Sequence, residues 1–469
     1  MTAPPSPETL ERLKTALGPG GWSDDPDRLA PKLVEWRDRW QGTTPLLLLP
    51  RTTAEVAAVV RLCAETRTAI TPQGGNTGLV GGQIPQGEVL LSLERMRAVR
   101  SLDPLDDAMV VEAGATLAAV HEAALEADRA FPLSLASEGS ATVGGLISTN
   151  AGGTAVLRYG TMRALVLGVE AVLPDGSVFE GLKRLRKDNT GYDLKQFLIG
   201  AEGTLGVVTA ASLKLFPRLR SRAVAVVGLD SPGDALALLA LAKAASGGAV
   251  EAFELMGRRG VDLAVKNIPG AREPLAEAHP WYVLVEFAMG QAGAAEAALE
   301  RVLATGFDAG LVGDAVVAQN QVQAHALWAL RENQSAAQKP EGVTWKHDIA
   351  VPVGAVPTFI DRATAAALAL TPDARVVAFG HLGDGNIHYD VIQPEGGDGA
   401  AHAALRDQGS RAIHDIAVAL GGSISAEHGL GTMKTAEALR YKAPAEVAAL
   451  RAIRAALDPN RIMNPRVLF

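Results

Sequence analysis

Residues 72–82 read PQGGNTGLVGG and follow a strand predicted over residues 69–72. Closely spaced glycines lack Cβ atoms, so the backbone N–H groups of such a loop can approach an anion and form a nest for phosphates. No Gly-Lys-Ser or Gly-Lys-Thr follows, which excludes a Walker loop, and the spacing is not that of a GxGxxG dinucleotide fingerprint. Residues 73–78, QGGNTG, therefore predict a phosphate-binding loop of another kind.

Two further segments have the same character. They read SEGSATVGGLISTNAGG (137–153) and IGAEGTLGVVT (199–209). Both contain too much Gly, Ser, Thr and Asn for a packed core, and both suit close backbone approach to a long, flat ligand. The alternative is that these are three unrelated glycine loops. That explanation would be easy to accept for one such segment and is harder to accept for three.

Strand and helix patterns alternate along the first part of the chain. A strand at 46–49 precedes a helix that Thr52 and Glu55 start as a capping box, and a strand pair is predicted within 166–182. This order favours an α+β domain with two small sheets over a doubly wound sheet. We predict an N-terminal helical segment over residues 1–40, a first domain over 41–218, a second domain over 219–415 and a helical C-terminal segment over 416–469.

Composition excludes several classes of protein. The 469 residues are 48% hydrophobic and 20% charged, with a net charge of −8, and the longest basic run is KRLRK (183–187). A nucleic-acid partner is therefore not expected. The one cysteine excludes an internal disulfide and a cysteine-rich zinc site. We expect a cytoplasmic protein without a membrane span, because neither a leader pattern nor a long uncharged apolar run is visible.

Residues 381–388, HLGDGNIH, place two histidines around a glycine-rich centre between β-branched runs. Asp384-Gly385 suits a two-residue hairpin turn, which would set His381 opposite His388 with Cβ atoms about 4.5–5.5 Å apart. Two imidazoles so placed can share one metal ion at roughly 2.0–2.1 Å per bond, and Asp390 is expected on the same face. The alternative is a hairpin whose histidines are only hydrogen-bonded.

The motif order resembles a known family. PQGGNTGLVGG, SxGSATVGGLISTNAGG, RYG and KDNTGYDLKQFLIGAEGTLGVVT are similar to the flavin-binding domain of the vanillyl-alcohol oxidase/PCMH superfamily. HLGDGNIHYDV and SAEHGLG resemble its D-2-hydroxyacid dehydrogenase branch, which includes D-lactate and D-2-hydroxyglutarate dehydrogenases. The resemblance implies an α+β fold: a PCMH-type FAD-binding domain of two α/β subdomains, a substrate-binding cap domain and a helical C-terminal segment that returns to the flavin.

The same resemblance implies FAD, with its pyrophosphate on residues 73–78. The first loop contains no His or Cys for covalent attachment, so we expect non-covalent FAD. The residues implied to bind FAD are Pro72, Gln73, Gly74, Gly75, Asn76, Thr77, Gly78, Ser140, Thr142, Gly145, Asn150, Gly152, Gly153, Glu202, Gly206, Val207 and Asn464.

A metal on His381 and His388 needs a third protein ligand, and Glu427 in SAEHGLG is the best candidate, in agreement with the resemblance. This donor set suits Zn²⁺, and also Mn²⁺, Co²⁺ or Fe²⁺. A metal chelated by an α-hydroxy acid would lower the pKa of the substrate hydroxyl. His428 would accept the proton, because an unperturbed imidazole pKa of about 6.5 suits a base at neutral pH. Flavin N5 would take the hydride.

Three residues match the branch's carboxylate-binding set by spacing. Arg331 lies on a predicted helix, Ser335 follows one turn later, and Lys346 lies on the next predicted strand. The resemblance implies that they bind the carboxylates of the acid, notably the distal carboxylate of 2-hydroxyglutarate. Asp390 departs from the asparagine of many members, and it would either serve as a fourth metal ligand or repel a second substrate carboxylate.

The sequence thus favours metal-assisted, FAD-dependent oxidation of a D-2-hydroxy acid, with D-2-hydroxyglutarate ahead of D-lactate or glycolate. A metal hydrolase without flavin and a non-catalytic flavoprotein subunit are the alternatives from other classes. The electron acceptor is expected to be an electron-transfer flavoprotein, a cytochrome or a quinone. A homodimer is compatible with the sequence, which does not determine the oligomeric state.

Overall fold

The computed structural model describes residues 4–468, which fold into two compact units. Unit 1 comprises the residues up to Gly153, Gly160–Arg218 and the residues from Glu427 onward. Unit 2 comprises Thr154–Tyr159 and Leu219–Ala426. The division after Arg218 coincides with an expected boundary. The boundary expected at 415/416 instead falls inside helix α16 (Arg406–Ala419), so unit 2 continues eleven residues further, to Ala426.

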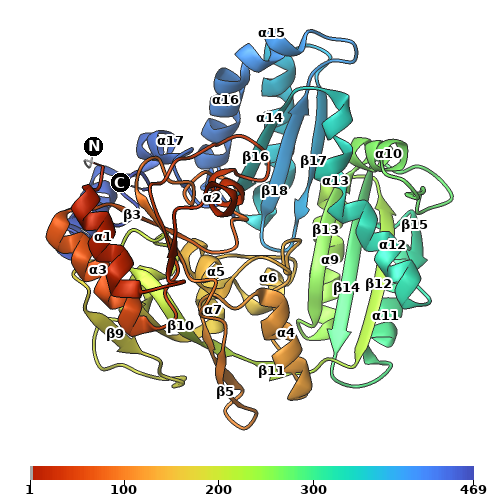
Figure 1. Cartoon of the computed structure of the whole chain (residues 1–469). Helices are drawn as coiled ribbons and strands as arrows, with labels where there is room; N and C mark the ends of the chain where they lie inside the picture. The colour runs from red at the N-terminus through yellow and green to blue at the C-terminus, as the bar shows by residue number, and fades with distance from the viewer. Residues whose placement is uncertain (1–3, 469) are drawn as a thin grey trace. The chain divides into compact units, whose positions relative to one another are not determined.

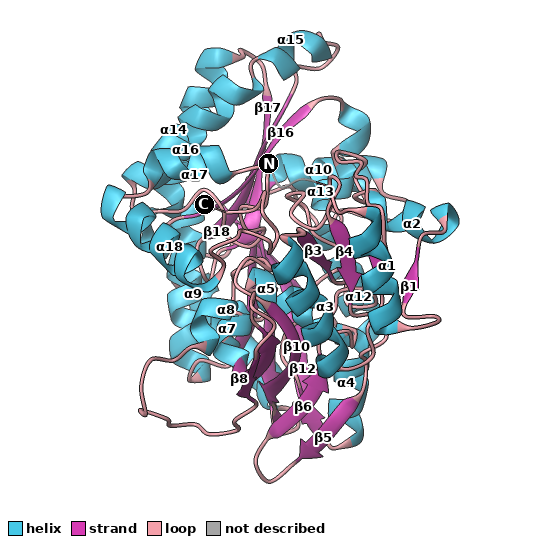
Figure 2. Ribbon diagram, turned by 60° about the vertical axis from the view of Figure 1, so that its left-hand side comes forward, coloured by secondary structure: helices cyan, strands magenta, loops and turns pink. Residues whose placement is uncertain are grey.

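Unit 1 contains two main sheets, as the strand order predicted (Figures 1 and 2). The first has the order β1-β2-β4-β3, with β2, β4 and β3 parallel. The second, β5-β6-β10-β8-β9, is antiparallel throughout. The strands are β1 (Trp22–Ser23), β2 (Leu47–Leu48), β3 (Ile70–Gln73), β4 (Val89–Ser92), β5 (Val99–Asp103), β6 (Ala108–Glu112), β8 (Val166–Val172), β9 (Val178–Gly181) and β10 (Val207–Lys214), with a small pair β7 (Arg129–Ala130) and β11 (Phe216–Pro217).

The helices of unit 1 include α3, whose start was predicted. Thr52 caps it by accepting from the N–H of Glu55 at 3.1 Å, while the Glu55 carboxylate accepts from the N–H of Arg51 at 2.7 Å. The first bond satisfies a backbone donor that a helix start leaves open, and the second holds the residue that precedes the cap. The helices are α1 (Pro7–Leu17), α2 (Pro26–Leu33), α3 (Thr53–Thr66), α4 (Leu117–Glu126), α5 (Val143–Thr149), α7 (Met162–Leu165), α8 (Lys195–Leu198), α17 (Thr435–Tyr441) and α18 (Pro444–Leu457).

Unit 2 is built on one antiparallel sheet of order β15-β12-β14-β13-β17-β18-β16 (Figure 1). Its strands are β12 (Ser221–Leu229), β13 (Val250–Gly257), β14 (Trp281–Met289), β15 (Asp314–Val317), β16 (Thr344–Ala350), β17 (Arg375–His381) and β18 (Asn386–Ile392). Its helices are α6 (Val156–Tyr159), α9 (Pro232–Ser246), α10 (Arg258–Asn267), α11 (Ala294–Asp308), α12 (Gln321–Glu332), α13 (Gln334–Ala337), α14 (Val356–Leu370), α15 (Gly399–Ala404) and α16, with short 3₁₀ turns at η1 (Lys339–Glu341) and η2 (Val353–Ala355).

The two faces of this sheet differ in chemistry because strand residues alternate between them. One face carries Phe253, Phe287 and Tyr389, which form the main core with residues of α9, α11, α14 and α16. The other face carries Val377 and Phe379 and packs against α10, α12 and α13. The predicted site residues Lys346 and His388 lie on this second face.

One described segment, Val353–Leu370, is long and apolar enough to cross a membrane, with a mean hydropathy of 1.3 and 28% of its residues buried. No such segment was expected from the sequence. Within it, α14 places Val356, Phe359 and Ala363 in the main core of unit 2. A core helix meets the same criteria of length and composition.

Candidate active site

The three glycine segments of unit 1 meet around the end of β3. A Cβ on Gly74 would lie 2.4 Å from Oγ1 of Thr142, and one on Gly75 would lie 1.8 Å from the carbonyl oxygen of Ser140. The first and second segments are therefore in a backbone contact that only glycine permits. The third segment joins them, because the Glu202 N–H donates to the Ser148 carbonyl at 2.7 Å.

Side chains of the first loop hold the loop itself. The Gln73 amide donates to the carbonyls of Lys32 and Gln83 at 2.9 and 3.0 Å. The Asn76 amide donates to Val34 at 2.9 Å, with Asn76 in the left-handed region at φ +55°. These bonds hold the loop through its side chains, and the backbone N–H groups of residues 74–78 are the donors that a phosphate nest would use.

Buried polar atoms around this loop fit a bound cofactor. Oε1 of Gln73, Oγ1 of Thr142 and Oδ1 of Asn464 are buried and make no hydrogen bond within the described chain. Buried polar atoms of a folded protein are normally paired, so such a group indicates a ligand or water. Asn464 comes from the C-terminal tail, whose backbone pairs with Ile70 of β3 at 2.8 Å. The tail thus returns to the loop, as predicted.

The remaining predicted cofactor residues belong to the same region but differ in their surroundings. Pro72 ends β3 with Gln73, and Gly203 approaches it, with a Cβ there 3.1 Å from the proline ring. Asn150 accepts from Thr161 Oγ1 at 3.0 Å and from the Arg163 N–H at 2.9 Å. Thr77, Gly78, Gly145 and Gly152 are half-buried, Ser140 is exposed, and Gly153, Gly206 and Val207 are buried.

The Glu202 carboxylate has a role inside unit 1 that the sequence did not reveal. It accepts from the N–H groups of Leu430 and Gly431 at 2.9 and 2.8 Å. Burial raises the pKa of Glu202, while these two N–H groups oppose that rise. The carboxylate thereby fixes the loop that directly follows Glu427 and His428. The Asn464 amide in turn donates to the Glu202 carbonyl at 2.8 Å.

The histidine hairpin of unit 2 has a register different from the predicted one. His381 pairs with Asn386 and His388 with Phe379, so the loop spans residues 382–385 and the two histidines are diagonal neighbours. The Asp384 carboxylate accepts from the Asn386 N–H at 3.0 Å, and the Gly385 N–H donates to the His381 carbonyl at 3.1 Å, which closes this longer loop.

The prediction that both imidazoles share one face is nevertheless confirmed. The observed loop has four residues where two were predicted, so the strand pairing is shifted by two residues. A shift by an even number leaves each side chain on the same face of the sheet. The two ring centroids are 5.9 Å apart, and the nearest ligand nitrogens of His381 and His388 lie within 4.8 Å of each other. Two nitrogen donors at this separation fit a divalent metal.

Two buried carboxylates beside the histidines were missed by the sequence analysis. Glu254 on β13 faces His381 Nδ1 at 2.7 Å. Asp348 on β16 pairs with His388, with 4.0 Å between Oδ1 and Nδ1. Burial acts to raise the pKa of Glu254, but the neighbouring His381 and Arg331 outweigh it and lower that pKa to about 2. No local motif marks these residues, because each comes from a different strand.

Glu427 and His428 begin the last segment of unit 1. The residue before them, Ala426, donates its N–H to the Asp348 carbonyl at 3.3 Å within unit 2. Asp348 is the strand partner of His388. The chain passes from unit 2 to unit 1 at the peptide bond between Ala426 and Glu427.

The predicted carboxylate-binding residues all lie on the polar side of the unit 2 sheet. Arg331 is near the end of α12, and its Nε donates to Glu254 Oε2 at 2.8 Å. Lys346 on β16 donates to Ser335 Oγ at 2.7 Å and lies 3.6 Å from a carboxylate oxygen of Asp390. Burial raises the pKa of Asp390, while Lys346 opposes that rise.

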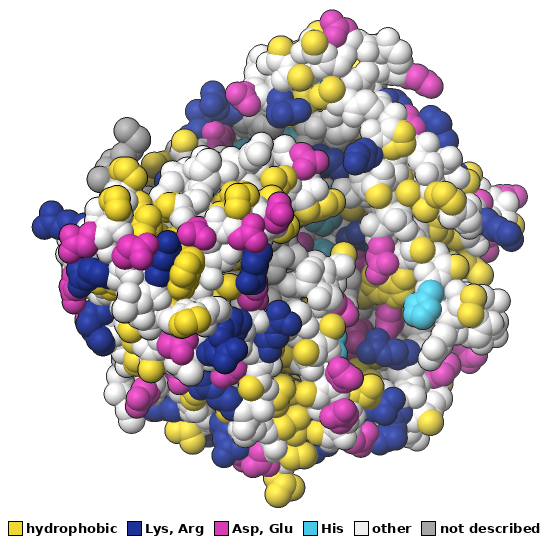
Figure 3. Space-filling model, in the orientation of Figure 1, with side chains coloured by type: hydrophobic (Ala, Val, Ile, Leu, Met, Phe, Trp, Pro, Cys, Tyr) yellow, Lys and Arg dark blue, Asp and Glu magenta, His cyan; other side chains and the backbone are white. Residues whose placement is uncertain are grey.

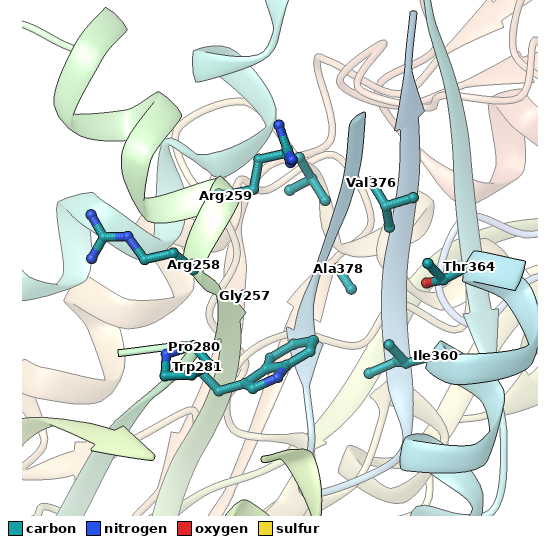
Figure 4. A pocket seen from close by; sticks show the side chains of 11 residues that line it. Gly257, Arg258, Arg259, Pro280, Trp281, Ile360, Thr364, Val376 and Ala378 are labelled. Carbon is teal, nitrogen blue, oxygen red and sulfur yellow. The ribbon is translucent and has the colours of Figure 1, made fainter. Parts of the chain in front are cut away.

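A cavity of about 160 Å³ in unit 2 contains none of these residues (Figure 4). Trp281, Ile360 and Thr364 line it together with Val376 and Ala378, which alternate with the residues of the polar face. The cavity therefore belongs to the apolar face of the sheet and is not the predicted site.

One further histidine of unit 2, His347 on β16, forms hydrogen bonds on the apolar side of the same sheet. Its Nδ1 faces the Tyr389 carbonyl at 2.6 Å, and its Nε2 faces Ser410 Oγ at 2.9 Å. Both ring nitrogens of His347 thus face partners on the side of the sheet opposite His388.

The face of the molecule seen in Figure 3 interleaves acidic and basic side chains without a broad basic field. Non-specific nucleic-acid binding depends on such a field.

Comparison with known families decides the identity. Residues 218–468 match the family model described as FAD linked oxidases, C-terminal domain, and residues 44–181 match an FAD binding domain. The chain belongs to the FAD-linked oxidase family. FAD is therefore its cofactor, and the predictions of a flavoprotein oxidoreductase and an FAD-dependent dehydrogenase are confirmed.

Relatives from several kingdoms span nearly the whole chain. It is 38% identical over 461 residues to a probable mitochondrial D-2-hydroxyglutarate dehydrogenase of Oryza sativa subsp. japonica, covering 98% of this chain and 81% of the relative. It is 39% identical over 463 residues to the mitochondrial D-2-hydroxyglutarate dehydrogenase of Bos taurus, covering 98% and 83%. It is 37% identical over 436 residues to the D-2-hydroxyglutarate dehydrogenase of Xanthomonas citri pv. viticola, covering 93% and 91%. The predicted branch is confirmed.

Solved structures confirm the predicted fold. An alkyldihydroxyacetonephosphate synthase superposes with a TM-score of 0.74 at 17% identity, covering 99% of this chain and 86% of its own. A p-cresol methylhydroxylase with bound substrate superposes with a TM-score of 0.75 at 14% identity, covering 98% and 96%. At such identities the likeness establishes the PCMH-type α+β fold alone.

One expectation is contradicted. The plant and animal relatives are named mitochondrial proteins, which conflicts with the cytoplasmic location expected from the sequence. The physical reason is that a folded catalytic chain carries no signature of its compartment, so a missing leader pattern could not establish one.

Proposed function

We propose that this enzyme oxidises D-2-hydroxyglutarate to the 2-oxo acid. The observation that carries the proposal is the polar face of the unit 2 sheet. Two imidazoles that fit a divalent metal lie there with Arg331 and Lys346, two cations suited to an acid with two carboxylates. Relatives at 37–39% identity carry the name of that activity.

In this proposal each group of site residues has a distinct role. His381, His388 and Glu427 hold the metal, which when bound lowers the pKa of the substrate hydroxyl and orients the acid. Arg331, Ser335 and Lys346 bind and orient the substrate carboxylates. His428 accepts the hydroxyl proton at an imidazole nitrogen.

Backbone groups of residues 73–78 and the two other glycine segments bind FAD, which supplies the hydride acceptor. Gly145 and Thr142 of the second segment and Asn464 of the tail are further contacts in this proposal. The first loop has no nucleophilic side chain that could attach to the flavin, so the binding is non-covalent.

The metal is proposed to be Zn²⁺, with Mn²⁺, Co²⁺ and Fe²⁺ compatible with the same donors. The reduced flavin must pass its electrons to an acceptor, proposed to be an electron-transfer flavoprotein, a cytochrome or a quinone. A relative from Saccharomyces cerevisiae, 33% identical over 453 residues, is named a D-2-hydroxyglutarate–pyruvate transhydrogenase, so a small 2-oxo acid is another class of acceptor.

A second candidate is oxidation of D-lactate or glycolate, which Asp390 favours because a carboxylate 3.6 Å from Lys346 competes with a distal substrate carboxylate. The deciding experiment is anaerobic reduction of the bound flavin by a panel of D- and L-2-hydroxy acids. We expect D-2-hydroxyglutarate to bleach the flavin fastest, with L-acids inactive. Faster bleaching by D-lactate or glycolate would select the second candidate.

A further inference from the structure

Glu254 joins the two halves of the proposed substrate site. Its side chain on β13 is 1% exposed, and its two oxygens contact different groups. Oε1 lies 2.7 Å from Nδ1 of His381, and Oε2 accepts from Nε of Arg331 at 2.8 Å. One buried carboxylate therefore contacts both a proposed metal ligand and a proposed substrate-binding cation.

The sheet itself sets this arrangement. Glu254 and His381 are register partners on the neighbouring strands β13 and β17, so their side chains leave the same face side by side. Arg331 reaches that face from α12, and its guanidinium lies over the Phe379 ring at 5.0 Å. The Glu254 bond and the aromatic ring together fix the plane of the guanidinium, whose Nη groups carry its remaining donors.

The carboxylate also decides which nitrogen of His381 can bind a metal. An ionised carboxylate only accepts hydrogen bonds, so the His381 proton must sit on Nδ1. The lone pair is then on Nε2, which is the nitrogen that would coordinate a metal ion. Carboxylates that orient ligating histidines in this way are a common support of metal sites.

We infer that Glu254 is a positioning residue that sets His381 for the metal and Arg331 for the substrate carboxylate at the same time. This inference rests on the proposed function. Its consequence is that loss of Glu254 weakens metal binding and substrate binding together, although Glu254 touches neither metal nor substrate.

Glu254→Gln is the most informative variant. The amide keeps the shape of the side chain but replaces one acceptor oxygen with an NH₂ donor. An amide that presents its oxygen to Arg331 presents its NH₂ to His381 Nδ1, which moves the imidazole proton to Nε2 and blocks the metal lone pair. The reversed amide sets NH₂ against Arg331 Nε. Glu254→Asp is shorter but remains an acceptor, so it should preserve the tautomer better than Gln does.

The matched control is Glu286→Gln. Glu286 is also a buried carboxylate of this sheet, on β14, and it is bound by the same helix α12 through the indole N–H of Trp328 at 2.8 Å. It also pairs with an arginine, Arg222, but it contacts no histidine. Loss of its charge tests the general effect of removing a buried carboxylate from unit 2.

The measurement is the Zn²⁺ dissociation constant of the FAD-loaded, metal-stripped protein, by competition with a chromophoric chelator, together with kcat and KM for D-2-hydroxyglutarate. We expect Glu254→Gln to lose about 10- to 100-fold in Zn²⁺ affinity and to raise KM, Glu254→Asp to lose less, and Glu286→Gln to bind Zn²⁺ normally. Wild-type affinity in Glu254→Gln, or better binding by Gln than by Asp, would overturn the inference, since a packing role favours the isosteric amide.

Two further outcomes are informative. If the wild-type protein itself takes up no Zn²⁺, the proposed metal site fails. If the wild-type protein binds Zn²⁺ and Glu254→Gln binds it equally well, only the inference about Glu254 fails. If Glu254→Gln does not fold, ¹⁵N NMR of histidine-labelled, metal-free wild-type protein decides. A proton on His381 Nδ1 supports the inference, whereas a neutral ring protonated only at Nε2 refutes it.

Discussion

Lys346 and Asp390 are register partners on β16 and β18, and their charged groups lie 3.6 Å apart at the polar face of the unit 2 sheet. From the sequence, Asp390 could be either a metal ligand or a charge that repels a second substrate carboxylate. The pairing with Lys346 favours the second interpretation, because the carboxylate partly neutralises the cation proposed to bind the substrate.

Replacing Asp390 with Asn should therefore strengthen binding of the dicarboxylate. Asn keeps the shape of the side chain and removes the competing charge from Lys346. We expect KM for D-2-hydroxyglutarate to fall about three- to tenfold, the range that about 0.7–1.4 kcal/mol gives, with little change for D-lactate. Elemental analysis is run in parallel, and loss of metal from the variant would show that Asp390 is a ligand instead.

Lys346→Gln should have the opposite effect. A charge-assisted hydrogen bond contributes roughly 1.5–3 kcal/mol, so kcat/KM for D-2-hydroxyglutarate should fall about ten- to a hundredfold. A larger loss for D-2-hydroxyglutarate than for D-lactate assigns Lys346 to the distal carboxylate, and equal losses assign it to the α-carboxylate. Lys339→Gln, at an exposed position of η1, is the control and should leave both rates unchanged.

The adjacent pair Glu427 and His428 should separate in a metal assay. His428→Ala should keep metal and FAD while the rate of flavin reduction falls about 10²–10⁴-fold, the contribution of a general base. The increase of the flavin-reduction rate with pH should disappear or shift to another pH in this variant. Glu427→Gln should lose metal first, because a neutral amide is a poorer ligand for a divalent cation. The reverse pattern, with metal lost only from His428→Ala, would show that the two roles are exchanged.

The flavin should leave the protein when the fold is lost. The first glycine loop contains no His or Cys, so acid or heat denaturation is expected to release FAD into the supernatant. Absorbance of the supernatant and of the washed precipitate measures the two fractions. Yellow colour that stays on the precipitated chain would establish a covalent bond.

His402 should make the protein less stable in mild acid. It is buried, stacks on Trp345 at 4.3 Å and lies 3.1 Å from the Val391 carbonyl through Nε2. Burial lowers the pKa of His402 below its usual value. Below about pH 6.5 the histidine is protonated in the unfolded state but not yet in the folded state. The contribution of neutral His402 to the free energy of unfolding is therefore complete above that pH and is lost as the pH falls.

The test is the free energy of unfolding between pH 7.5 and pH 5. His402→Gln retains a donor for Val391 but cannot titrate, so its stability should fall less steeply with decreasing pH, by at most about 1.4 kcal/mol per pH unit for one proton. His325→Gln, on the exposed side of α12, serves as the control. An unchanged slope in His402→Gln would contradict the prediction.

Local pattern was enough for the elements and for the face on which the histidines lie. The capping box at Thr52, the strand at Lys346 and the glycine loop after β3 depend on contacts within a few residues. The face shared by His381 and His388 depends only on whether the loop length is even. The exact register did not follow, because the Asp384 side chain closes a loop of residues 382–385 that the dipeptide rule does not describe.

The sequence by itself thus determined the flavin fold, the family and the set of candidate residues, since these reside in short motifs whose chemistry is local. Only the tertiary structure revealed Glu254, which lies 127 residues before His381 in the chain and is its register partner on the neighbouring strand. Likewise, only folding brings the Glu202 carboxylate to the N–H groups of Leu430 and Gly431. Such contacts depend on the order of the strands in the sheet and on the path by which the chain comes back to them. The spacing of residues along the sequence does not indicate which distant residues will become neighbours.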